Sequence, residues 1–333
     1  MRNRLLIAAL VLLTSASALG AKPKKKRRRA LIPLPKVIPA PPDNPTTTAK
    51  AALGKQLFFD ARLSGDNKMS CATCHAPEKG FSDGRRFAIG ANGMKLTRNT
   101  QSTWDVGLFR SFFWDGRAKS LEQQALMPIQ SPKEMNQPLA SLVKELRAVP
   151  GYRKSFRKVF QRQVSGPDIG RALAAYQRTL ISRGSAFDRY LMGDKKALSP
   201  LAKAGLELFK GDAGCVRCHN GPLLSDSKFY RLGIGRDVGL GGITKQRKDR
   251  YKFRTPSLRN IAHTGPYMHD GSLRTLFDVV QFYYRGVPTR GQEGLPLDVE
   301  SLVGQSFSEI DAIVAFLRTL SGKPQKIKRP VLP

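Results

Sequence analysis

All four cysteines of this 333-residue chain fall into two Cys-x-x-Cys pairs, and a histidine directly follows each pair. Two thiols at this spacing can add across the two vinyl groups of one haem, and the next histidine is then held beneath the iron as its proximal ligand. The sequence therefore predicts two covalently attached haems c. The attachment residues are Cys71, Cys74 and His75 for the first haem, and Cys215, Cys218 and His219 for the second.

Other kinds of site also use pairs of cysteines. A thioredoxin-like redox pair needs no histidine, and a four-cysteine zinc site would leave both histidines without a role. Two disulfides would be the ordinary use of four cysteines in an exported chain, but they do not explain the histidines either. Haem attachment accounts for all six residues.

The axial position opposite each proximal histidine decides what a haem can do. Iron with protein ligands on both faces transfers electrons, whereas an open face can bind and activate a small oxidant. Because residues 1–218 contain no histidine besides His75, the first haem is predicted to be open or to bind water. For the second haem the residues alone leave several candidate ligands, namely His263, Tyr267, Met268, His269, Tyr283 and Tyr284.

The surroundings of the two motifs repeat, which predicts two similar structural units. A Gly-x-x-Leu-Phe pattern precedes each motif, at residues 54–58 and 205–209, and a Ser-Asp pair follows each motif. We therefore expect a mainly α-helical protein with two cytochrome c-like haem domains in tandem. The first would cover residues 46–194 and the second residues 195–325, with the boundary between 194 and 199.

Helix signals dominate the rest of the sequence. A capping box at residues 120–123 predicts a helix start, and Pro167 suits the first turn of a helix that continues to Ile181. Further helices are predicted over residues 199–208 and, from a second capping box, over residues 306–320. We find no sustained alternation of polar and apolar residues that would predict a sheet.

Residues 1–20 have the pattern of a cleavable signal peptide, because two arginines precede a short apolar run and then small residues up to Gly20. The run is too short to cross a bilayer and no later segment is longer, so we predict an exported, periplasmic protein without a transmembrane segment. Residues 21–45 form a basic, proline-rich leader that we expect to be semi-extended and to pack against nothing. Residues 326–333 form a short tail.

The net charge of +32 bears on the partners of the protein. Eight of the positive charges lie in the leader, so the remainder of the chain is strongly basic too. Such a field attracts acidic proteins, anionic lipids or cell-wall polymers, and export makes nucleic acid the least suitable partner. We expect an acidic partner protein. The alternative is that the basic surface only maintains solubility.

Several longer motifs occur between residues 46 and 322. They are Arg98-Asn99-Thr100, Phe113-Trp114-Asp115-Gly116-Arg117, Leu121-Glu122-Gln123-Gln124, Arg254-Thr255-Pro256-Ser257-Leu258-Arg259-Asn260 and Pro266-Tyr267-Met268-His269-Asp270-Gly271. In this order they resemble the bacterial di-haem cytochrome c peroxidase family. Within that family the chain is most similar to the MauG-like subgroup, whose second haem has histidine and tyrosine ligands.

This resemblance implies roles on the distal face of the first haem. In the family a glutamine and a glutamate follow the tryptophan of Trp-Asp-Gly-Arg by ten and twenty residues, which here are Gln124 and Glu134. Glu134 would be the proton shuttle for O–O cleavage, Gln124 would hydrogen-bond the oxidant, and Pro128 would shape the pocket. Trp114 would bridge the two haems. The alternative is that Gln124 and Glu134 are ordinary helix-surface residues and that Trp114 is an aromatic residue of the core.

Two positions differ from many peroxidases of the family. Those enzymes place a distal histidine sixteen residues after the first proximal histidine, where this chain has Ala91. The resemblance therefore implies a first haem that is open without reductive activation. They also place a methionine where this chain has Tyr283, which selects Tyr283 over Tyr284 as the second axial ligand. A phenolate stabilises ferric and higher oxidation states, whereas a thioether raises the reduction potential.

The resemblance also implies a bound calcium ion between the domains. The family's calcium ligands map to the side chain of Asn99 and to the backbone carbonyls of Thr264 and Pro266. Such hard oxygen donors suit Ca²⁺. The alternative is that Asn99 and Pro266 only shape turns.

These observations predict a periplasmic haem-dependent peroxidase. It would cleave H₂O₂ at the first haem and pass oxidising equivalents through the second haem to a side chain of a protein partner. The only tryptophans are residues 104 and 114, so the exit residue near the second haem would have to be Tyr230, Tyr251 or Tyr284. One alternative is a cytochrome c peroxidase that receives electrons from a small cytochrome c or cupredoxin, and another is a non-catalytic di-haem electron carrier.

Overall fold

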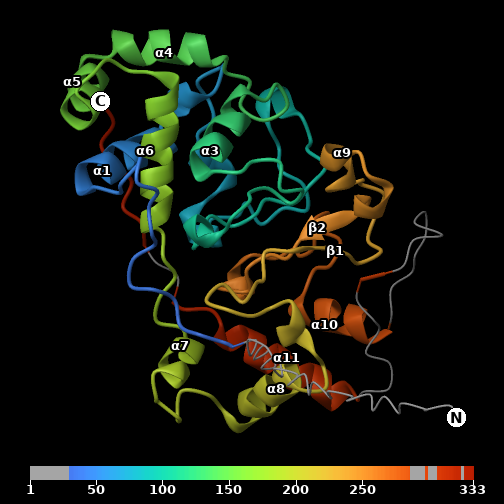
Figure 1. The fold of residues 1–333 in the computed structure, drawn as a ribbon. Coiled ribbons are helices and arrows are strands. Elements are labelled where there is room, and N and C mark those ends of the chain that lie inside the picture. The colour runs from blue at the N-terminus through green and yellow to red at the C-terminus, as the bar shows by residue number, and fades with distance from the viewer. Residues whose placement is uncertain (1–29, 286–296, 299–305, 324–325) are drawn as a thin grey trace, which may run out of the picture.

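A computed structural model describes residues 30–285, 297–298, 306–323 and 326–333 (Figure 1). Within these residues the chain forms eleven α-helices, several short 3₁₀ helices and one sheet of two strands. The expectation of a mainly helical fold is therefore confirmed. No helix in these ranges is long and apolar enough to span a membrane. The predicted signal peptide and the beginning of the basic leader lie outside the described residues.

The N-terminal half packs its helices around the first Cys-x-x-Cys-His motif. The core residues Leu57, Phe58, Tyr152 and Phe156 are almost fully buried, and Phe58 makes edge-on ring contacts with its aromatic neighbours. Because these side chains come from several helices, they fix the helices relative to one another. The helices are α1 (Thr48–Phe59), α2 (Cys71–Cys74), α3 (Leu121–Gln130), α4 (Leu139–Ala148), α5 (Pro150–Phe160) and α6 (Gly166–Thr179).

The C-terminal half has its own core around the second motif. Phe187, Phe209 and Phe316 are nearly inaccessible, and their rings meet edge to face at centroid distances of 5.1 to 5.3 Å. The elements are α7 (Ala186–Leu191), α8 (Pro200–Lys210), β1 (Phe229–Arg231), α9 (Gly241–Thr244), β2 (Lys252–Arg254), α10 (Leu276–Arg285) and α11 (Phe307–Thr319).

The predicted helix starts are confirmed. Ser120 accepts a hydrogen bond from the backbone N–H of Gln123 at the start of α3, and Ser306 forms the predicted capping box at the start of α11. Pro167 lies in the first turn of α6, as expected. This helix ends at Thr179, two residues before the predicted end, because Leu180 leaves helical geometry.

Two helix crossings of the same kind occur in the two halves. Gly54 lets α1 approach α6, and Gly205 lets α8 approach α11 (Figure 1). A Cβ atom on either glycine would lie 1.8 Å from a backbone oxygen, of Ala172 in the first crossing and of Ala312 in the second. The repeated Gly-x-x-Leu-Phe pattern therefore marks a close helix contact that each half needs.

Changing either glycine to alanine should destabilise the protein. The added methyl group would meet backbone rather than a flexible side chain, so we expect Gly54→Ala or Gly205→Ala to lower the free energy of unfolding by about 1–3 kcal/mol or more. Chemical denaturation would measure this loss. Gly242→Ala in α9 is the matched control, because its nearest neighbour is the side chain of Val238 at 3.1 Å. If all three variants lost the same free energy of unfolding, the close helix crossings would not be the cause.

The described part of the leader corrects one expectation. Instead of packing against nothing, residues 30–45 lie along the protein, and Ile38 is only 1% exposed. The carbonyl of Ala30 accepts a hydrogen bond from the N–H of Gly221 at 2.8 Å, and the carbonyl of Ile32 accepts one from Arg259 at 3.2 Å. Proline has no N–H, but an extended proline-rich chain still offers its carbonyls as acceptors, and arginines of the body use them.

The tail also packs on a distant part of the chain. Val331 and Pro333 accept hydrogen bonds through their carbonyls from Gln56 and Arg62 respectively, each at 3.0 Å. Ile327 packs against the N-terminal core. The C-terminus therefore lies beside α5 and α1 (Figure 1), whereas residues 30–32 lie on the C-terminal half.

A small sheet is present where none was predicted. Strands β1 and β2 pair antiparallel, with Tyr230 opposite Phe253. Each strand has only three residues, which is too short for an alternating pattern to be recognised in the sequence. The sheet matters because β2 leads directly to residues of the candidate site.

Candidate haem site

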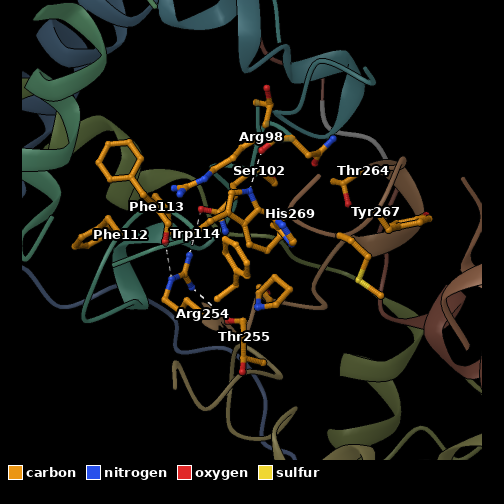
Figure 2. A pocket seen from close by; sticks show the side chains of 18 of the residues that line it. Arg98, Ser102, Phe112, Phe113, Trp114, Arg254, Thr255, Thr264, Tyr267 and His269 are labelled. Carbon is orange, nitrogen blue, oxygen red and sulfur yellow. Dashed lines mark hydrogen bonds between the residues drawn. The ribbon is translucent and has the colours of Figure 1, made fainter. Parts of the chain in front are cut away.

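One continuous cavity of about 960 Å³ is lined by both Cys-x-x-Cys-His motifs. This volume lies near the upper end of the roughly 300–1,000 Å³ that is typical of cofactor pockets. Residues of both halves line the cavity, and Figure 2 shows the part in which Trp114, Arg254 and His269 meet. The structure thus brings together two motifs that are separated by 140 residues between Cys74 and Cys215.

The two proximal histidines have the same local geometry. His75 Nδ1 lies 3.1 Å from the carbonyl oxygen of Phe81, and His219 Nδ1 lies 2.9 Å from that of Leu224. Since a carbonyl can only accept, Nδ1 carries the proton in both rings and Nε2 keeps its lone pair for a metal. Burial lowers the pKa of both histidines, which favours the same neutral form.

The cysteine thiols are not tuned for redox exchange. Burial raises the pKa of Cys71 and of Cys215 to about 12, and it raises that of Cys74 to about 11, with Asp83 and then Glu134 adding to the shift. Reactive thiols of redox pairs have a lowered pKa instead. The donor set and its geometry therefore fit covalent haem attachment better than a thioredoxin-like site.

The residues predicted for the distal face of the first haem line the cavity together. Gln124 and Pro128 come from α3, and Glu134 comes from the loop that follows it. The backbone N–H of Ala91 donates a hydrogen bond to the carbonyl of Glu134 at 2.7 Å. Ala91 is itself buried behind this loop and does not line the cavity, whereas its neighbour Gly90 does.

The six candidates for the second axial position lie in different surroundings. Tyr283 lines the cavity, and burial raises its pKa, with the nearby thiols of the second motif adding to the shift. Tyr284 also lines the cavity but belongs to the C-terminal core, and the hydroxyl of Tyr267 donates to a backbone carbonyl at 3.1 Å. His263 points elsewhere, with Nε2 at 2.9 Å from the carbonyl of Gly322. Met268 and His269 line the cavity as well.

The local geometry of residues 99–130 repeats in residues 254–285, with an offset of 155 residues that also relates α3 to α10. Phe113 and Met268 both have a left-handed backbone, and so do Asp105 and Asn260, each of which precedes a 3₁₀ helix. The isolated bridge between residues 112 and 118 recurs between residues 267 and 273. By this offset Pro128 corresponds to Tyr283 and Trp114 to His269. Sequence reasoning missed the correspondence, which a comparison of Trp-Asp-Gly with His-Asp-Gly would have suggested.

Trp114 and His269 face each other where the two halves meet. Their ring centroids are 6.4 Å apart at an interplanar angle of 72°, and His269 also stacks on Phe253 at 3.6 Å. Two reciprocal backbone bonds of 2.8 Å hold the loops, from the N–H of Asn99 to the carbonyl of His269 and from the N–H of Arg254 to the carbonyl of Trp114. This arrangement supports the predicted position of Trp114 between the motifs.

An ion-pair cluster beside this contact was not anticipated. Arg98 pairs with Asp115 at 2.5 Å and with Asp237 at 2.6 Å, and so ties the loop of Trp114 to the C-terminal half. Asp115 is almost fully buried and is also paired with Arg117. The sequence motif contained Arg98, but nothing near Asp237 in the sequence marked it as the partner.

The residues predicted to bind calcium also line the cavity. The side-chain N–H of Asn99 donates to the carbonyl of Arg85 at 2.8 Å, so its Oδ1 remains available as an acceptor. Thr264 and Pro266 belong to the loop that leads to His269, whose carbonyl binds the Asn99 N–H. The described residues contain no cluster of three His, Cys, Asp or Glu side chains that could hold a metal. The predicted calcium ligands are an amide oxygen and backbone carbonyls, which do not belong to such a cluster, so calcium stays a prediction.

The chain matches known proteins over nearly its whole length. Residues 48–196 match the family model of di-haem cytochrome c peroxidases. The chain is 39% identical to the methylamine utilization protein MauG of Methylophilus methylotrophus, over 99% of this chain and 98% of that protein. It is 36% identical to the cytochrome c551 peroxidase of Pseudomonas aeruginosa, over 90% of this chain and 87% of the other. A solved MauG-like protein associated with microbial copper homeostasis aligns with a TM-score of 0.80 at 34% identity, covering 87% of this chain and 95% of that one.

The helical fold and the shared cavity of two haem-attachment motifs define a di-haem oxidoreductase. The chain belongs to the di-haem cytochrome c peroxidase family, and within that family it is MauG-like. It is therefore a haem-dependent peroxidase. The expected family and enzyme class are both confirmed.

Proposed function

We propose that this protein reduces H₂O₂ at the first haem and passes the oxidising equivalents through the second haem to a side chain of a protein partner. One observation carries the proposal, namely that both attachment motifs line the same cavity as Gln124, Glu134, Trp114 and Tyr283. A non-catalytic carrier would need neither the carboxyl group of Glu134 nor the amide of Gln124 in that cavity. The match to the MauG relative extends over 99% of this chain, so the MauG-like resemblance, which implies oxidation of a protein side chain, covers both halves.

Haem c supplies the redox chemistry when it is bound. The thiols of Cys71 and Cys74 would hold one haem covalently and those of Cys215 and Cys218 the other. Each proximal histidine would present Nε2 to the iron, since its Nδ1 donates to a backbone carbonyl. Both carbonyls belong to residues with left-handed backbone, Phe81 and Leu224, which directly precede the repeated Ser-Asp pairs.

On the distal face of the first haem the chain's own groups would handle the oxidant. Glu134 would move a proton between the two oxygen atoms of the peroxide, and the amide of Gln124 would donate a hydrogen bond to it. Pro128 would limit the space above the haem. The loop of Ala91 would position Glu134 through the bond to its carbonyl.

Tyr283 would be the protein ligand of the second haem besides His219. It occupies the position that Pro128 has in the other half, so one structural position would serve as an open distal face in one half and as a ligand in the other. An anionic phenolate would favour the higher oxidation states of the iron. Trp114 would connect the two haems, and Tyr230 and Tyr251, which both line the cavity, are the candidate exit residues besides Tyr284.

The two haems would belong to two cytochrome c-like domains, at residues 46–194 and 195–325. The separate cores and the equivalent helix crossings support two such domains, but α7 packs in the C-terminal core through Phe187, so the boundary would fall before α7 and not at residue 194. We further propose that residues 1–20 direct export to the periplasm and that the basic surface docks an acidic partner. The names of the peroxidase relatives favour a second candidate function, in which a small cytochrome c or cupredoxin supplies electrons and water is the product.

Optical and EPR spectra of the purified ferric protein, before and after one equivalent of H₂O₂, test the proposal. We expect one high-spin and one low-spin haem, followed by a persistent oxidised species that forms without prior reduction. Two low-spin haems that ignore peroxide until they are reduced would instead indicate a peroxidase that needs activation. A lack of reaction in either state would indicate a carrier.

Calcium removal should lower the stability of the loaded protein. If Asn99, Thr264 and Pro266 bind Ca²⁺, then Ca²⁺ at 100 times its Kd stabilises the fold by about 2.7 kcal/mol. We expect EGTA to lower the Tm and added Ca²⁺ to restore it. Asn99→Ala should have a Tm that no longer responds to either, whereas Asn220→Ala, which changes a half-exposed asparagine outside this set of residues, should still respond. Identical responses of the wild type and Asn99→Ala would rule out this site.

A further inference from the structure

Arg254, at the end of β2, is a buried cation that has no carboxylate partner among the described residues. It is only 3% exposed and lines the cavity between the two motifs. Arg98, Arg117 and Arg259 line the same cavity, and each of them forms an ion pair with a buried aspartate. Arg217 also lines the cavity without an ion pair, but its side chain is exposed to solvent. Among the buried and half-buried arginines of the cavity, Arg254 is therefore the exception.

The contacts of the Arg254 guanidinium are all with neutral groups. Its N–H groups point toward the carbonyls of Phe113 and Thr255 at 3.3 and 3.4 Å, and toward the side-chain oxygen of Gln101 at 3.5 Å. The ring of Phe109 lies 3.7 Å from its central carbon. These hydrogen bonds are long, so the five donors of the guanidinium are only weakly engaged.

This environment is costly for a cation. Burial lowers the pKa of Arg254 to about 9, whereas arginine normally remains protonated far above that value. Burying a charge without an opposite charge is strongly unfavourable, and proteins rarely do so unless a ligand supplies the counter-charge. The neutral contacts alone could be made by glutamine at lower cost.

The position of Arg254 indicates where the missing charge would lie. Its N–H binds the carbonyl of Trp114, just as the N–H of Asn99 binds the carbonyl of His269. Arg254 thus occupies, in the C-terminal half, the position that Asn99 has in the N-terminal half. Figure 2 shows the Arg254 side chain next to Trp114, with its hydrogen bonds to Phe113 and Thr255. The guanidinium lies where the two halves meet, between the two attachment motifs.

We propose that Arg254 binds a carboxylate in this cavity and that a propionate side chain of a bound haem supplies it. A planar guanidinium can hold a carboxylate with two parallel hydrogen bonds, which is the strongest pairing available to arginine. Haem is the only carboxylate-bearing group that the family implies in this space. The inference rests on haem being bound at the motifs, and it goes beyond the roles assigned above to Glu134, Gln124 and Tyr283.

The pairing predicts an effect on the reduction potential. A fixed positive charge beside the propionate disfavours the extra positive charge of ferric iron and so raises the potential of that haem. For Arg254→Gln we expect one haem to favour the ferric state tenfold more than in the wild type, which corresponds to about 59 mV for one electron. Arg254→Lys keeps the charge and should retain most of the wild-type potential.

Spectroelectrochemical titration of the haem-loaded protein would test this. Haem content is first measured by the pyridine haemochrome spectrum, which separates a loss of attachment from a change at the anion site. Arg117→Gln is the matched control, because it removes one positive charge from the same cavity but from a residue that already has a carboxylate partner. A lower potential in Arg254→Gln than in Arg117→Gln supports the proposal, and equal shifts in both variants overturn it.

A second measurement covers the case in which Arg254→Gln does not fold. Resonance Raman spectra of the wild type and of Arg254→Lys report the bending mode of the haem propionates, and this mode should shift when the bidentate donor is replaced. An unchanged mode overturns the proposal. Titration with inorganic phosphate at constant ionic strength identifies the source of the anion. A wild-type potential that depends on phosphate, and loses that dependence in Arg254→Lys, would mean that a solution anion and not a propionate occupies the site.

Discussion

Glu134→Gln is expected to lower peroxide turnover by about 100-fold or more, because a positioned acid-base group contributes roughly 10²–10⁴-fold to a reaction of this kind. Glutamine keeps the size of the side chain but cannot carry a proton between the peroxide oxygens. Haem content and the ferric spectrum should stay close to those of the wild type. Stopped-flow measurement of H₂O₂ consumption would give the rate.

The control for Glu134→Gln is Glu78→Gln. Glu78 lies three residues after the first proximal histidine, is exposed and does not line the cavity, so its loss should leave the rate unchanged. A Glu134→Gln protein that reacts as fast as the wild type would remove Glu134 from the mechanism. A protein in which neither the wild type nor any variant reacts would be a carrier rather than a peroxidase.

Tyr283→Met should change the redox properties of the second haem strongly. Replacing a phenolate with a thioether is expected to raise the reduction potential of that haem on the order of 0.1 V or more, within the roughly 0.8 V that axial ligands can span. The persistent oxidised species formed with H₂O₂ should then disappear. Redox titration and the optical spectrum after one equivalent of peroxide would measure both effects.

The neighbouring tyrosine provides a control for this experiment. Tyr284→Phe removes a hydroxyl one residue away, in a side chain that belongs to the C-terminal core. If Tyr283 is the ligand, Tyr284→Phe should keep the wild-type potential of the second haem. If Tyr284→Phe changed the potential and Tyr283→Met did not, the family alignment would have selected the wrong residue.

The sequence predicted those parts of the structure that depend on neighbouring residues. The two attachment motifs are local, and so are the helix starts at Ser120 and Ser306, because a cap involves residues only three positions apart. The motifs of the family also indicated Gln124 and Glu134, and both line the cavity. Their roles were implied by resemblance and remain to be tested.

Contacts between distant residues could not be predicted in this way. Asp237 lies 139 residues from Arg98, and nothing in its own neighbourhood indicates that it binds an arginine. The unpaired charge of Arg254 appears only when the burial of its side chain is known. The leader was misjudged for a related reason, since its composition resembles that of a solvated linker while its carbonyls find donors far along the chain.

The contacts of residues 30–32 and 326–333 limit the order in which the protein can fold during synthesis. Residues 326–333 are synthesised after all the described helices, yet they pack on α1 and beside α5, which are made early. Residues 30–32, made early, find their partners only when Gly221 and Arg259 exist. The N-terminal half therefore cannot reach its final surface before residues 326–333 have been made, so a chain truncated before them would have its defect in the part that is synthesised first.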